Sequence, residues 1–420
     1  NITFNSSTLA NYTAAADGGD DDIIITANRN SATTIATTLG VSTSAATALD
    51  AGVTAAAGDV TVTAAYNTAL VAGGTEASKT AEQSEPAPAS GASAAIGGGA
   101  TTVANILSGR LASVRGETGG AAYASRGHSG FAAGDGAMNK SAWARSFVNS
   151  ANQGDNTDAD GGRIDGYDGS TYGIAAGIDG MVGEKVRLGV SFAYSDTNID
   201  GDGVQDDETD ISSYQFTLYS DYTTDKYYLE GMLSYGYNDM ETSRKINFGG
   251  LNLDAKGDFS ADQYTARVGG GIPLRSGKHV FTPNAAFQYT HVSSDSYTET
   301  GAGVLNLVVD PEDLDMAVGI LGLNYQTTYD AKNGSWTPQI RTSVSYDFAS
   351  DDADSVSRFT GTTTTFTTKG AEVEEFGGAA GAGLTYSTSD GRWDLSADYD
   401  ADIKSDYLSH TGSLRAKYNF

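Results

Sequence analysis

The chain of 420 residues contains no cysteine, so disulfides cannot hold it together, and an exported protein that needs none is a suitable class. Proline is scarce at 6 residues, whereas glycine reaches 53 and tyrosine 23, which favours a β-protein over a helical enzyme. No run of about 18 apolar residues occurs, which excludes a membrane-spanning helix. No secretory signal begins at Asn1, so we expect a mature or trimmed form.

Basic side chains are also in short supply. The 25 lysines and arginines are outnumbered by 53 aspartates and glutamates, which gives a net charge of −28 and a pI near 4.2. This balance excludes a nucleic-acid partner bound through phosphate neutralisation. It also argues against binding to anionic lipid through a basic face.

The first 84 residues are interpreted as two short strands followed by a weakly helical region. The segments NITFNSS (1–7) and DDIIITANRN (21–30) each predict a strand, with an acidic turn from Asp17 to Asp22 between them. Residues 31–84 carry apolar side chains at roughly helical spacing, although their threonine content lowers helix propensity.

A linker and an amphipathic helix follow over residues 85–140. Residues 85–99 (EPAPASGASAAIGGG) have the composition of a linker. From Ala100 to Gly116 the apolar spacing predicts a helix with one apolar face. Residues 117–139 are small and polar and show no periodicity.

From residue 141 to the end, apolar residues recur with a period of two. In 336–348 they alternate with small or polar residues, and 393–403 repeats the pattern with aspartates on the polar face. Alternation alone fits either a soluble β-sandwich or an outer-membrane barrel, whose lipid face uses every second residue.

Strand number and loop length decide between these two folds. Every second connection is a tight turn (GEK, TTDK, RSGK, DAKNGS, TSDGR), whereas the others are long and rich in Asp, Gly and Thr. An even strand number with short turns at one end and long loops at the other is typical of bacterial barrels. The twelve predicted strands are 141–153, 167–182, 186–199, 208–222, 227–241, 258–273, 280–297, 314–329, 336–347, 372–388, 393–403 and 408–420.

The predicted fold class is therefore all-β, a 12-stranded antiparallel outer-membrane β-barrel over residues 141–420. Its last strand places Leu414 and Tyr418 on one face and ends at Phe420, which predicts a signal for the outer-membrane barrel assembly machinery. Aromatic residues near strand ends are expected at the membrane interfaces. They are Tyr227, Tyr237, Tyr289, Tyr329, Trp336, Trp393 and Tyr418.

Four segments occur in a characteristic order, ILSGRLASVRG (106–116), SAWARSF (141–147), YGIAAGIDG (172–180) and the terminal LRAKYNF. With the sequence of helix, spacer, twelve strands and final Phe, they make residues 100–420 resemble the translocator domain of type V secretion autotransporters. The resemblance implies a helix inside the barrel lumen. It also implies an N-terminal passenger carried to the surface of a Gram-negative bacterium.

Barrel size agrees with a helix in the lumen, because eight strands fill with their own side chains and sixteen leave a wide channel. The lumen helix would present Val103, Ile106, Leu107, Arg110, Leu111 and Arg115. Inward aspartates form an acidic wall that needs water or cations, namely Asp394, Asp398, Asp400 and Asp402. The expected cationic partners are Arg110 and Arg115 of the helix, with Arg187, Arg267 and Arg341.

The segment ahead of the linker is interpreted as a passenger remnant. Passengers of this family often form a right-handed β-helix of several hundred residues, and residues 1–30 resemble the last rungs of one. We therefore expect Asn1 to be the cut end of a longer precursor. Some members cleave the passenger at an Asn-Asn pair in the helix, but this helix has only Asn105, so that chemistry is not expected.

One acidic loop, 196–207 (DTNIDGDGVQDD), has the spacing of oxygen ligands in a calcium loop. Its candidate ligands are Asp196, Asn198, Asp200, Asp202 and Asp207. The loop is either a weak extracellular calcium site or a solvated acidic tip, and no other cofactor is expected.

No enzymatic site is expected. The four histidines are scattered, and no GxSxG element occurs, so neither a Ser-His-Asp triad nor a metal cluster is indicated. These histidines are His128, His279, His291 and His410.

The predicted function is transport and display. A monomeric barrel, surrounded by outer-membrane lipid and lipopolysaccharide, would translocate and anchor its own N-terminal segment. The alternatives are a passive diffusion channel, and a surface adhesin that acts through the long acidic extracellular loops.

Overall fold

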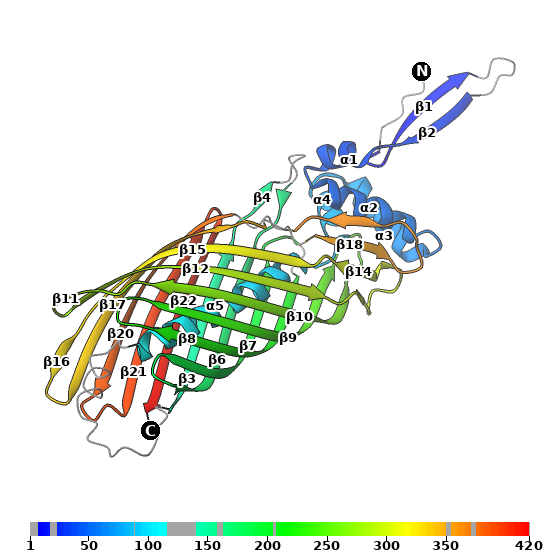
Figure 1. The fold of residues 1–420 in the computed structure, drawn as a ribbon. Coiled ribbons are helices and arrows are strands. Elements are labelled where there is room, and N and C mark those ends of the chain that lie inside the picture. The colour runs from blue at the N-terminus through cyan, green and yellow to red at the C-terminus, as the bar shows by residue number, and fades with distance from the viewer. Residues whose placement is uncertain are drawn as a thin grey trace.

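Twelve long strands form a closed antiparallel barrel in the computed structural model (Figure 1). The structure describes residues 7–16, 23–87, 89–115, 140–157, 163–204, 207–349, 354–370 and 375–419. The barrel strands are β3 (Lys140–Gln153), β6 (Tyr167–Val182), β7 (Val186–Gly201), β8 (Glu208–Thr223), β9 (Tyr228–Ile246), β10 (Leu253–Gly271), β12 (His279–Ser294), β15 (Leu314–Thr327), β17 (Gly334–Asp347), β20 (Phe376–Thr388), β21 (Trp393–Lys404) and β22 (Tyr407–Asn419). Successive strands pair with one another, and β3 pairs with β22 to close the ring.

The predicted strand number is confirmed, and most strand ends lie within about two residues of the predicted ones. The clearest difference is at the β9–β10 hairpin. Strand β9 ends at Ile246 and not at the predicted residue 241, and β10 begins at Leu253 and not at the predicted residue 258. Inward residues here, such as Met240 and Ala255, are buried in the same core as the N-terminal helices. Packing beyond the membrane therefore extends the pairing.

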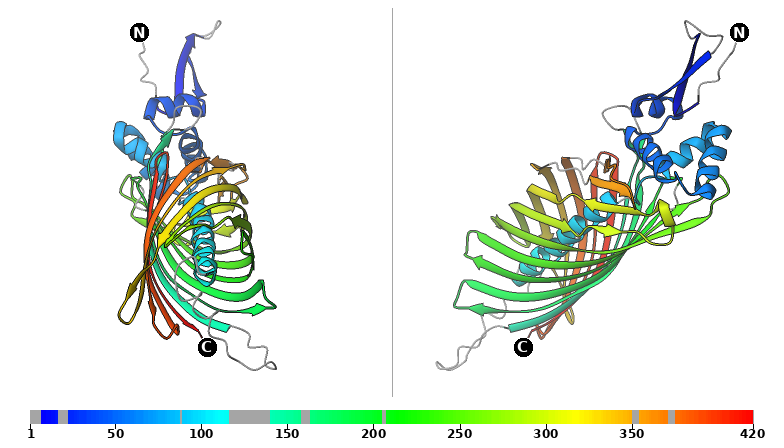
Figure 2. Two further views of the ribbon diagram at one scale, coloured as in Figure 1. Left: turned by 60° about the vertical axis from the view of Figure 1, so that its left-hand side comes forward. Right: turned by 90° about the vertical axis from the view of Figure 1, so that its right-hand side faces the viewer.

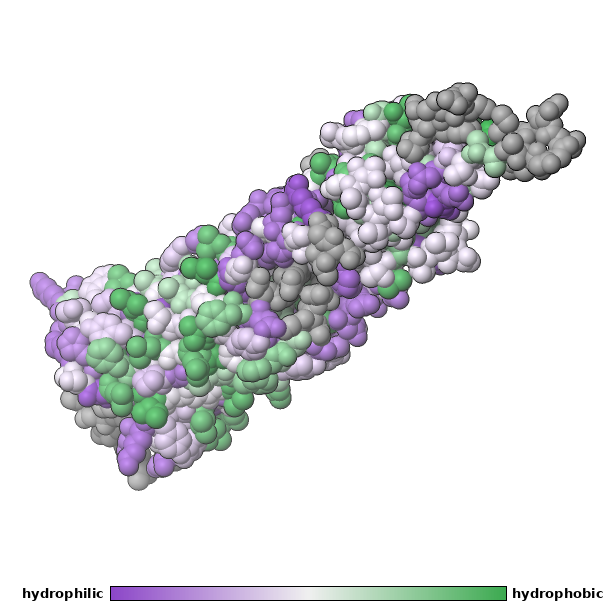
Figure 3. All heavy atoms as spheres, turned by 90° about the horizontal axis from the view of Figure 1, so that it is seen from above, coloured by the Kyte–Doolittle hydropathy of each residue, from purple (hydrophilic) through white to green (hydrophobic). Residues whose placement is uncertain are grey.

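The two faces of the barrel wall differ as the alternation predicts. Leu218, Leu233 and Val268 expose 51%, 63% and 59% of their surface on the outside. Their chain neighbours Thr217 and Arg267 are buried inside. Figure 3 shows apolar side chains gathered over the barrel wall, with hydrophilic side chains toward its ends.

The two ends of the barrel also differ. Tight hairpins make one end, and two of them are extended by β11 (Leu274–Ser276) and β16 (Tyr329–Ala331). The connections at the other end contain β4 (Asn156–Thr157), β5 (Arg163–Ile164), β13 (Tyr297–Thr298), η1 (Gly303–Leu305), β14 (Leu307–Pro311), β18 (Ser355–Phe359) and β19 (Phe366–Thr368). Of these, β13, β14, β18 and β19 form a four-stranded sheet. Because short turns face the periplasm in such barrels, the second end is extracellular.

Four helices sit over the extracellular end (Figures 1 and 2). They are α1 (Ala32–Leu39), α2 (Thr43–Ala55), α3 (Val60–Ala72) and α4 (Gly74–Glu82), and we call residues 32–87 the helical cap. The side chains of Ser31, Ser42 and Asp59 accept backbone N–H groups at the first three helix starts. The region predicted as weakly helical is thus well formed, because its alanine-rich faces pack into a core with Phe248 and Phe359.

Ahead of the cap, β1 (Ala10–Ala16) and β2 (Ile23–Arg29) form an antiparallel hairpin. The predicted second strand is confirmed, whereas the first lies at 10–16 and residues 1–6 are outside the described part. Adjacent strands of a right-handed β-helix run parallel, so the interpretation of these residues as β-helix rungs is wrong. The acidic turn residues 17–22 are also outside the described part.

Helix α5 (Ala89–Val114) passes through the middle of the barrel (Figure 2). It begins eleven residues before the predicted start, so the interpretation of 85–99 as a linker is wrong for 89–99. Small residues let this part of the helix fit beside the wall. A Cβ added at Gly97 would lie only 2.4 Å from Met316 Sδ. Among the described residues, no helix is both long and apolar enough to cross a membrane.

Candidate functional site in the barrel lumen

The apolar face of α5 packs against one side of the lumen wall. Val103, Ile106, Leu107 and Leu111 are each at most 5% exposed. They form a cluster with the inward side chains Trp143, Phe147, Ala175, Ala193, Tyr219 and Met232. The helix therefore lies in the lumen, with these four predicted residues against the wall.

Arg110 is the most deeply buried charge on α5, with no exposed surface. Its Nε and Nη2 donate to the two carboxylate oxygens of Asp179 on β6, at 2.8 and 2.9 Å. Arg187 Nη1 also donates to Asp179 at 2.6 Å, and the Tyr219 hydroxyl does so at 3.0 Å. This fork geometry fixes both the height and the rotation of the helix in the lumen.

Arg115 makes a second attachment near the periplasmic end of the lumen. Its Nη1 lies 2.5 Å from Asp221 Oδ1 on β8 and 3.1 Å from Glu230 Oε2 on β9. The guanidinium carbon stands 3.5 Å from the centroid of the Tyr228 ring. The Ser108 hydroxyl donates to Glu230 Oε1 at 2.7 Å. Arg110 of α5 and Arg115 directly after it therefore hold the helix to strands β6, β8 and β9.

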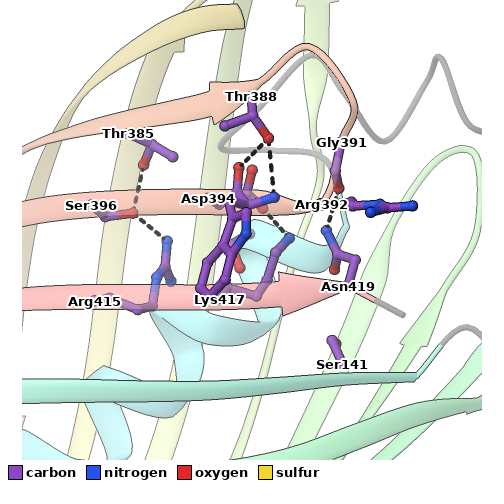
Figure 4. A network of polar contacts seen from close by, with 12 residues as sticks. Ser141, Thr385, Thr388, Gly391, Arg392, Asp394, Ser396, Arg415, Lys417 and Asn419 are labelled. Atoms are coloured by element: carbon purple, nitrogen blue, oxygen red, sulfur yellow. Dashed lines mark hydrogen bonds and ion pairs between the residues drawn. The ribbon is translucent and has the colours of Figure 1, made fainter.

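In the acidic wall of β21, Asp394, Asp398 and Asp400 are paired with cations. Arg341 Nη1 lies 2.9 Å from Asp398 Oδ1, and its Nη2 lies 2.9 Å from Asp400 Oδ1. Arg145 Nη2 is 3.4 Å from Asp398 Oδ2. Figure 4 shows the end of this wall, where Lys417 pairs with Asp394.

The predicted partners of the wall are correct only for Arg341. Arg110 and Arg115 pair with acids on β6, β8 and β9 instead, and Arg187 pairs with Asp179. Arg267 Nη1 donates to Asn105 Oδ1 of α5 at 2.9 Å. The helix leans on the opposite wall, so its arginines do not reach β21. The partners that the sequence reasoning missed are Arg145 and Lys417, which the inward alternation of β3 and β22 could have identified.

The last strand contacts the helix as well. Arg415 Nη1 donates to the Gly109 backbone oxygen at 3.1 Å. Its Nη2 donates to the Ser396 hydroxyl at 2.8 Å (Figure 4). Beside α5 on this side, a cavity of about 190 Å³ lies between the helix and the barrel wall, and most of its wall residues come from strands β12 to β22. Polar and charged side chains line this space, which is large enough to hold water.

The extracellular mouth is held to the cap by Arg244 of β9, which is 1% exposed. Its guanidinium lies 2.5 Å from Glu299 Oε2 and donates to the Gln83 backbone oxygen at 2.7 Å. The Gln83 Oε1 accepts the backbone N–H of Asn247 at 2.8 Å. The chain that enters the lumen from the cap is therefore bound to the barrel rim just before α5 begins.

The candidate calcium ligands do not form a loop. Asp196, Asn198 and Asp200 lie along β7, where residues four apart are separated by roughly 13 Å, so Asp196 and Asp200 are too far apart to share one calcium shell. Asp207 is only 3% exposed, and its Oδ1 accepts the Lys245 backbone N–H. Within the described ranges no three His, Asp or Glu side chains are placed to hold a metal ion. Pairing with β8 keeps residues 196–200 extended, so this part of the segment does not adopt the turn of an EF-hand loop. Asp202 follows the strand and is exposed.

Histidines and interfacial aromatics lie apart from the lumen. His279, His291 and His410 each contact an outward residue, respectively Tyr325, Asp315 and Tyr399. His128 and the terminal Phe420 are outside the described residues. Leu414 is 64% exposed on the outer face, and Tyr418 pairs with Trp393 at a ring distance of 4.9 Å.

This fold and its contents define a class of protein, an outer-membrane barrel that encloses a helix of its own chain. A family model for the autotransporter β-domain matches residues 142–400. The translocator domain of the autotransporter NalP from Neisseria meningitidis has the same fold, with a TM-score of 0.55, 15% identity, and coverage of 77% of this chain and 98% of that chain. The chain belongs to the autotransporter β-domain family.

Longer relatives agree with this assignment. Outer membrane protein A of Rickettsia conorii is 25% identical over 288 residues, which are 66% of this chain and 14% of that relative. Outer membrane protein B of Rickettsia prowazekii is 26% identical over 287 residues, covering 66% of this chain and 17% of that relative. The chain spans less than a fifth of either relative. It corresponds to the outer-membrane β-barrel domain of this family.

Proposed function

We propose that the barrel anchors its own N-terminal segment at the cell surface, with α5 kept in the lumen as a plug and the helical cap kept over the extracellular mouth. The anchoring needs no catalytic residue or cofactor, because it rests on packing and ion pairs. The barrel would work as a monomer. A plain diffusion channel is not favoured, since the lumen is occupied.

The attachment of Arg110 to Asp179 is the observation that carries this proposal. Both side chains are 0% exposed, and Asp179 also accepts from Arg187 and Tyr219. Breaking a buried ion pair by removing one partner costs about 3–5 kcal/mol. Withdrawal of α5 would break this pair together with the Arg115 contacts, so the helix is held firmly.

Conductance through a planar bilayer tests the plug. We expect the wild-type protein to show a small, mostly closed conductance, and Arg110→Met to show larger and more frequent openings. Arg29→Met is the matched control, because Arg29 pairs with Asp50 outside the barrel. A wide, stable pore in the wild-type protein, or identical records for the two variants, would refute the plug.

Surface labelling of intact cells tests the display. A peptide tag in the turn around Gly58, which lies between α2 and α3, should be cut by external protease while the barrel remains intact. A tag in the periplasmic turn at Gly277 should be protected until the outer membrane is opened. Protection of the first tag would contradict the proposed orientation.

We also propose that the last strand presents its outward face to the barrel assembly machinery, and that the outer wall contacts membrane lipid and lipopolysaccharide. Leu414→Asp should lower the yield of folded barrel in the outer membrane, because it places a charge in the lipid-facing row. Ser413→Asp, on the lumen side, is the control for charge alone. Equal yields would contradict a role for this face.

A further inference from the structure

The periplasmic end of the barrel concentrates basic side chains that are scarce elsewhere. Its five turns (183–185, 224–227, 272–278, 328–333 and 389–392) carry six basic and four acidic residues, whereas the whole chain carries 25 and 53. All six bases are exposed, namely Lys185, Lys226, Arg275, Lys278, Lys332 and Arg392, and we call them the basic rim. This end is locally positive in a chain of net charge −28.

Two of the four acidic side chains at these turns are hydrogen-bonded or ion-paired within the turns themselves. Asp390 accepts the Thr388 hydroxyl at 2.6 Å and the Arg392 backbone N–H at 3.1 Å. Asp330 pairs with Lys278 of the neighbouring turn at 3.1 Å. Within the described residues, no carboxylate lies at ion-pair distance from Lys185, Lys226 or Lys332. The charge of these three lysines faces outward, toward whatever surrounds the turns.

Outward aromatic rings lie beside the basic rim. Trp336 packs on Tyr386 and Trp393 on Tyr418, with ring centroids 4.7 and 4.9 Å apart. Phe281 and Tyr325 form a third pair at 4.8 Å, next to the turn that carries Arg275 and Lys278. Amphipathic rings of this kind lie at the level of lipid headgroups. The basic rim therefore lies at the same level or just beyond it.

We propose that the basic rim binds the anionic headgroups of phospholipids in the periplasm-facing leaflet of the outer membrane. The outer wall next to the turns is apolar, so lipid surrounds the barrel at this level. Lipid phosphate oxygens accept hydrogen bonds from lysine and arginine. The acidic extracellular end does not oppose this binding. A strand of 16 residues such as β6 spans about 50 Å, whereas charges in water are screened within about 8 Å.

The distribution of charge over the barrel matters more for lipid contact than the composition of the whole chain. A net charge of −28 argues against a basic face only if the charges are mixed over the surface. Here the turns gather bases at one end, and the extended strand ends carry acids at the other. Lipid contact depends on the charge within a Debye length and not on the total.

Tryptophan fluorescence tests the proposal directly. Trp336 and Trp393 are 44% and 45% exposed beside the rim, whereas Trp143 is 4% exposed in the lumen and serves as an internal reference. The full chain is folded into phosphatidylcholine vesicles that contain phosphatidylglycerol, with bromine on the acyl chains of one lipid or the other. At low salt, brominated phosphatidylglycerol should associate about threefold more strongly than brominated phosphatidylcholine. The ratio of phosphatidylglycerol to phosphatidylcholine association should approach one in about 0.5 M salt.

A charge-neutralised variant and its matched control complete the test. The rim variant combines Lys185→Gln, Lys226→Gln and Lys332→Gln. The control removes three charges from the cap and extracellular strand ends, with Lys79→Gln, Lys245→Gln and Lys256→Gln. We expect the rim variant to lose the preference for phosphatidylglycerol and the control to keep it. Equal quenching by both lipids in the wild-type protein, a preference that salt leaves intact, or a rim variant that keeps it would overturn the proposal.

Discussion

Three consecutive glycines lie inside α5, at 97–99, and their replacement by alanine gives a sharp prediction. A Cβ added at Gly98 or Gly99 would meet no atom within 4 Å. Glycine inside a helix costs about 0.5–1 kcal/mol relative to alanine, because more backbone freedom is lost on folding. Gly98→Ala combined with Gly99→Ala should therefore stabilise this part of the helix by about 1–2 kcal/mol.

Hydrogen exchange measured by mass spectrometry is the appropriate assay, because it reports local opening of the helix. A gain of about 1–2 kcal/mol should slow exchange of the amides around these positions by roughly 5- to 30-fold. Amides of the barrel strands should be unaffected, since they exchange through separate openings. Unchanged or faster exchange in the helix would refute the reasoning.

Gly97→Ala provides the contrast. Its new Cβ would stand 2.4 Å from Met316 Sδ, so the methionine must move before the alanine fits. We expect exchange to slow much less than in the double variant, or to accelerate. An equal gain at all three positions would show that contact with β15 plays no part.

The remaining predictions concern the cap and the acidic strand ends. Arg244→Met should destabilise the cap by about 3–5 kcal/mol, because it strands the buried carboxylate of Glu299, and limited proteolysis of α1–α4 should accelerate; unchanged protection would contradict the clamp. Burial raises the pKa of Glu85 from 4.5 to about 8, so the folded cap keeps a proton that the unfolded chain loses. The contribution of Glu85 to cap stability should thus be complete below about pH 4.5 and decline as the pH rises to about 8. Limited proteolysis at about pH 5 and pH 9 should show a smaller change in cleavage rate for Glu85→Gln than for the wild-type protein. An equal change in both proteins would show that another group causes the pH dependence. Because Asp200 lies within a strand, titration calorimetry should show no calcium heat that Asp200→Ala removes, and such heat would restore the calcium-site hypothesis.

Most of the barrel could be predicted from the sequence because each strand has one lipid face, and period two records that environment directly. The hairpin of β9 and β10 exceeds its prediction where the outer surroundings change from lipid to water. There the inward residues, such as Ile246, pack on the cap. No local pattern predicts a contact between residues so far apart in the chain as Tyr66 and Phe248.

The lumen site was harder to predict in its pairings than in its members. Alternation identifies Asp398 and Arg341 as inward, and helical spacing identifies Arg110 as facing the wall. Which acid meets Arg110 depends on the height and rotation of α5, and these are set by packing against Trp143 and Tyr219. The early start of α5 was missed because a glycine-rich segment is a poor helix in water, although its small residues suit an enclosed space.

The seam between β3 and β22 also constrains the order of events in time. The ring cannot be complete until the final strand has been made and has found the first one, which follows α5 in the chain. Arg145 of β3 and Arg415 of β22 both project inward at this seam, and Arg415 holds the Gly109 carbonyl. Closure of the ring and capture of its contents therefore belong to the same late step of assembly.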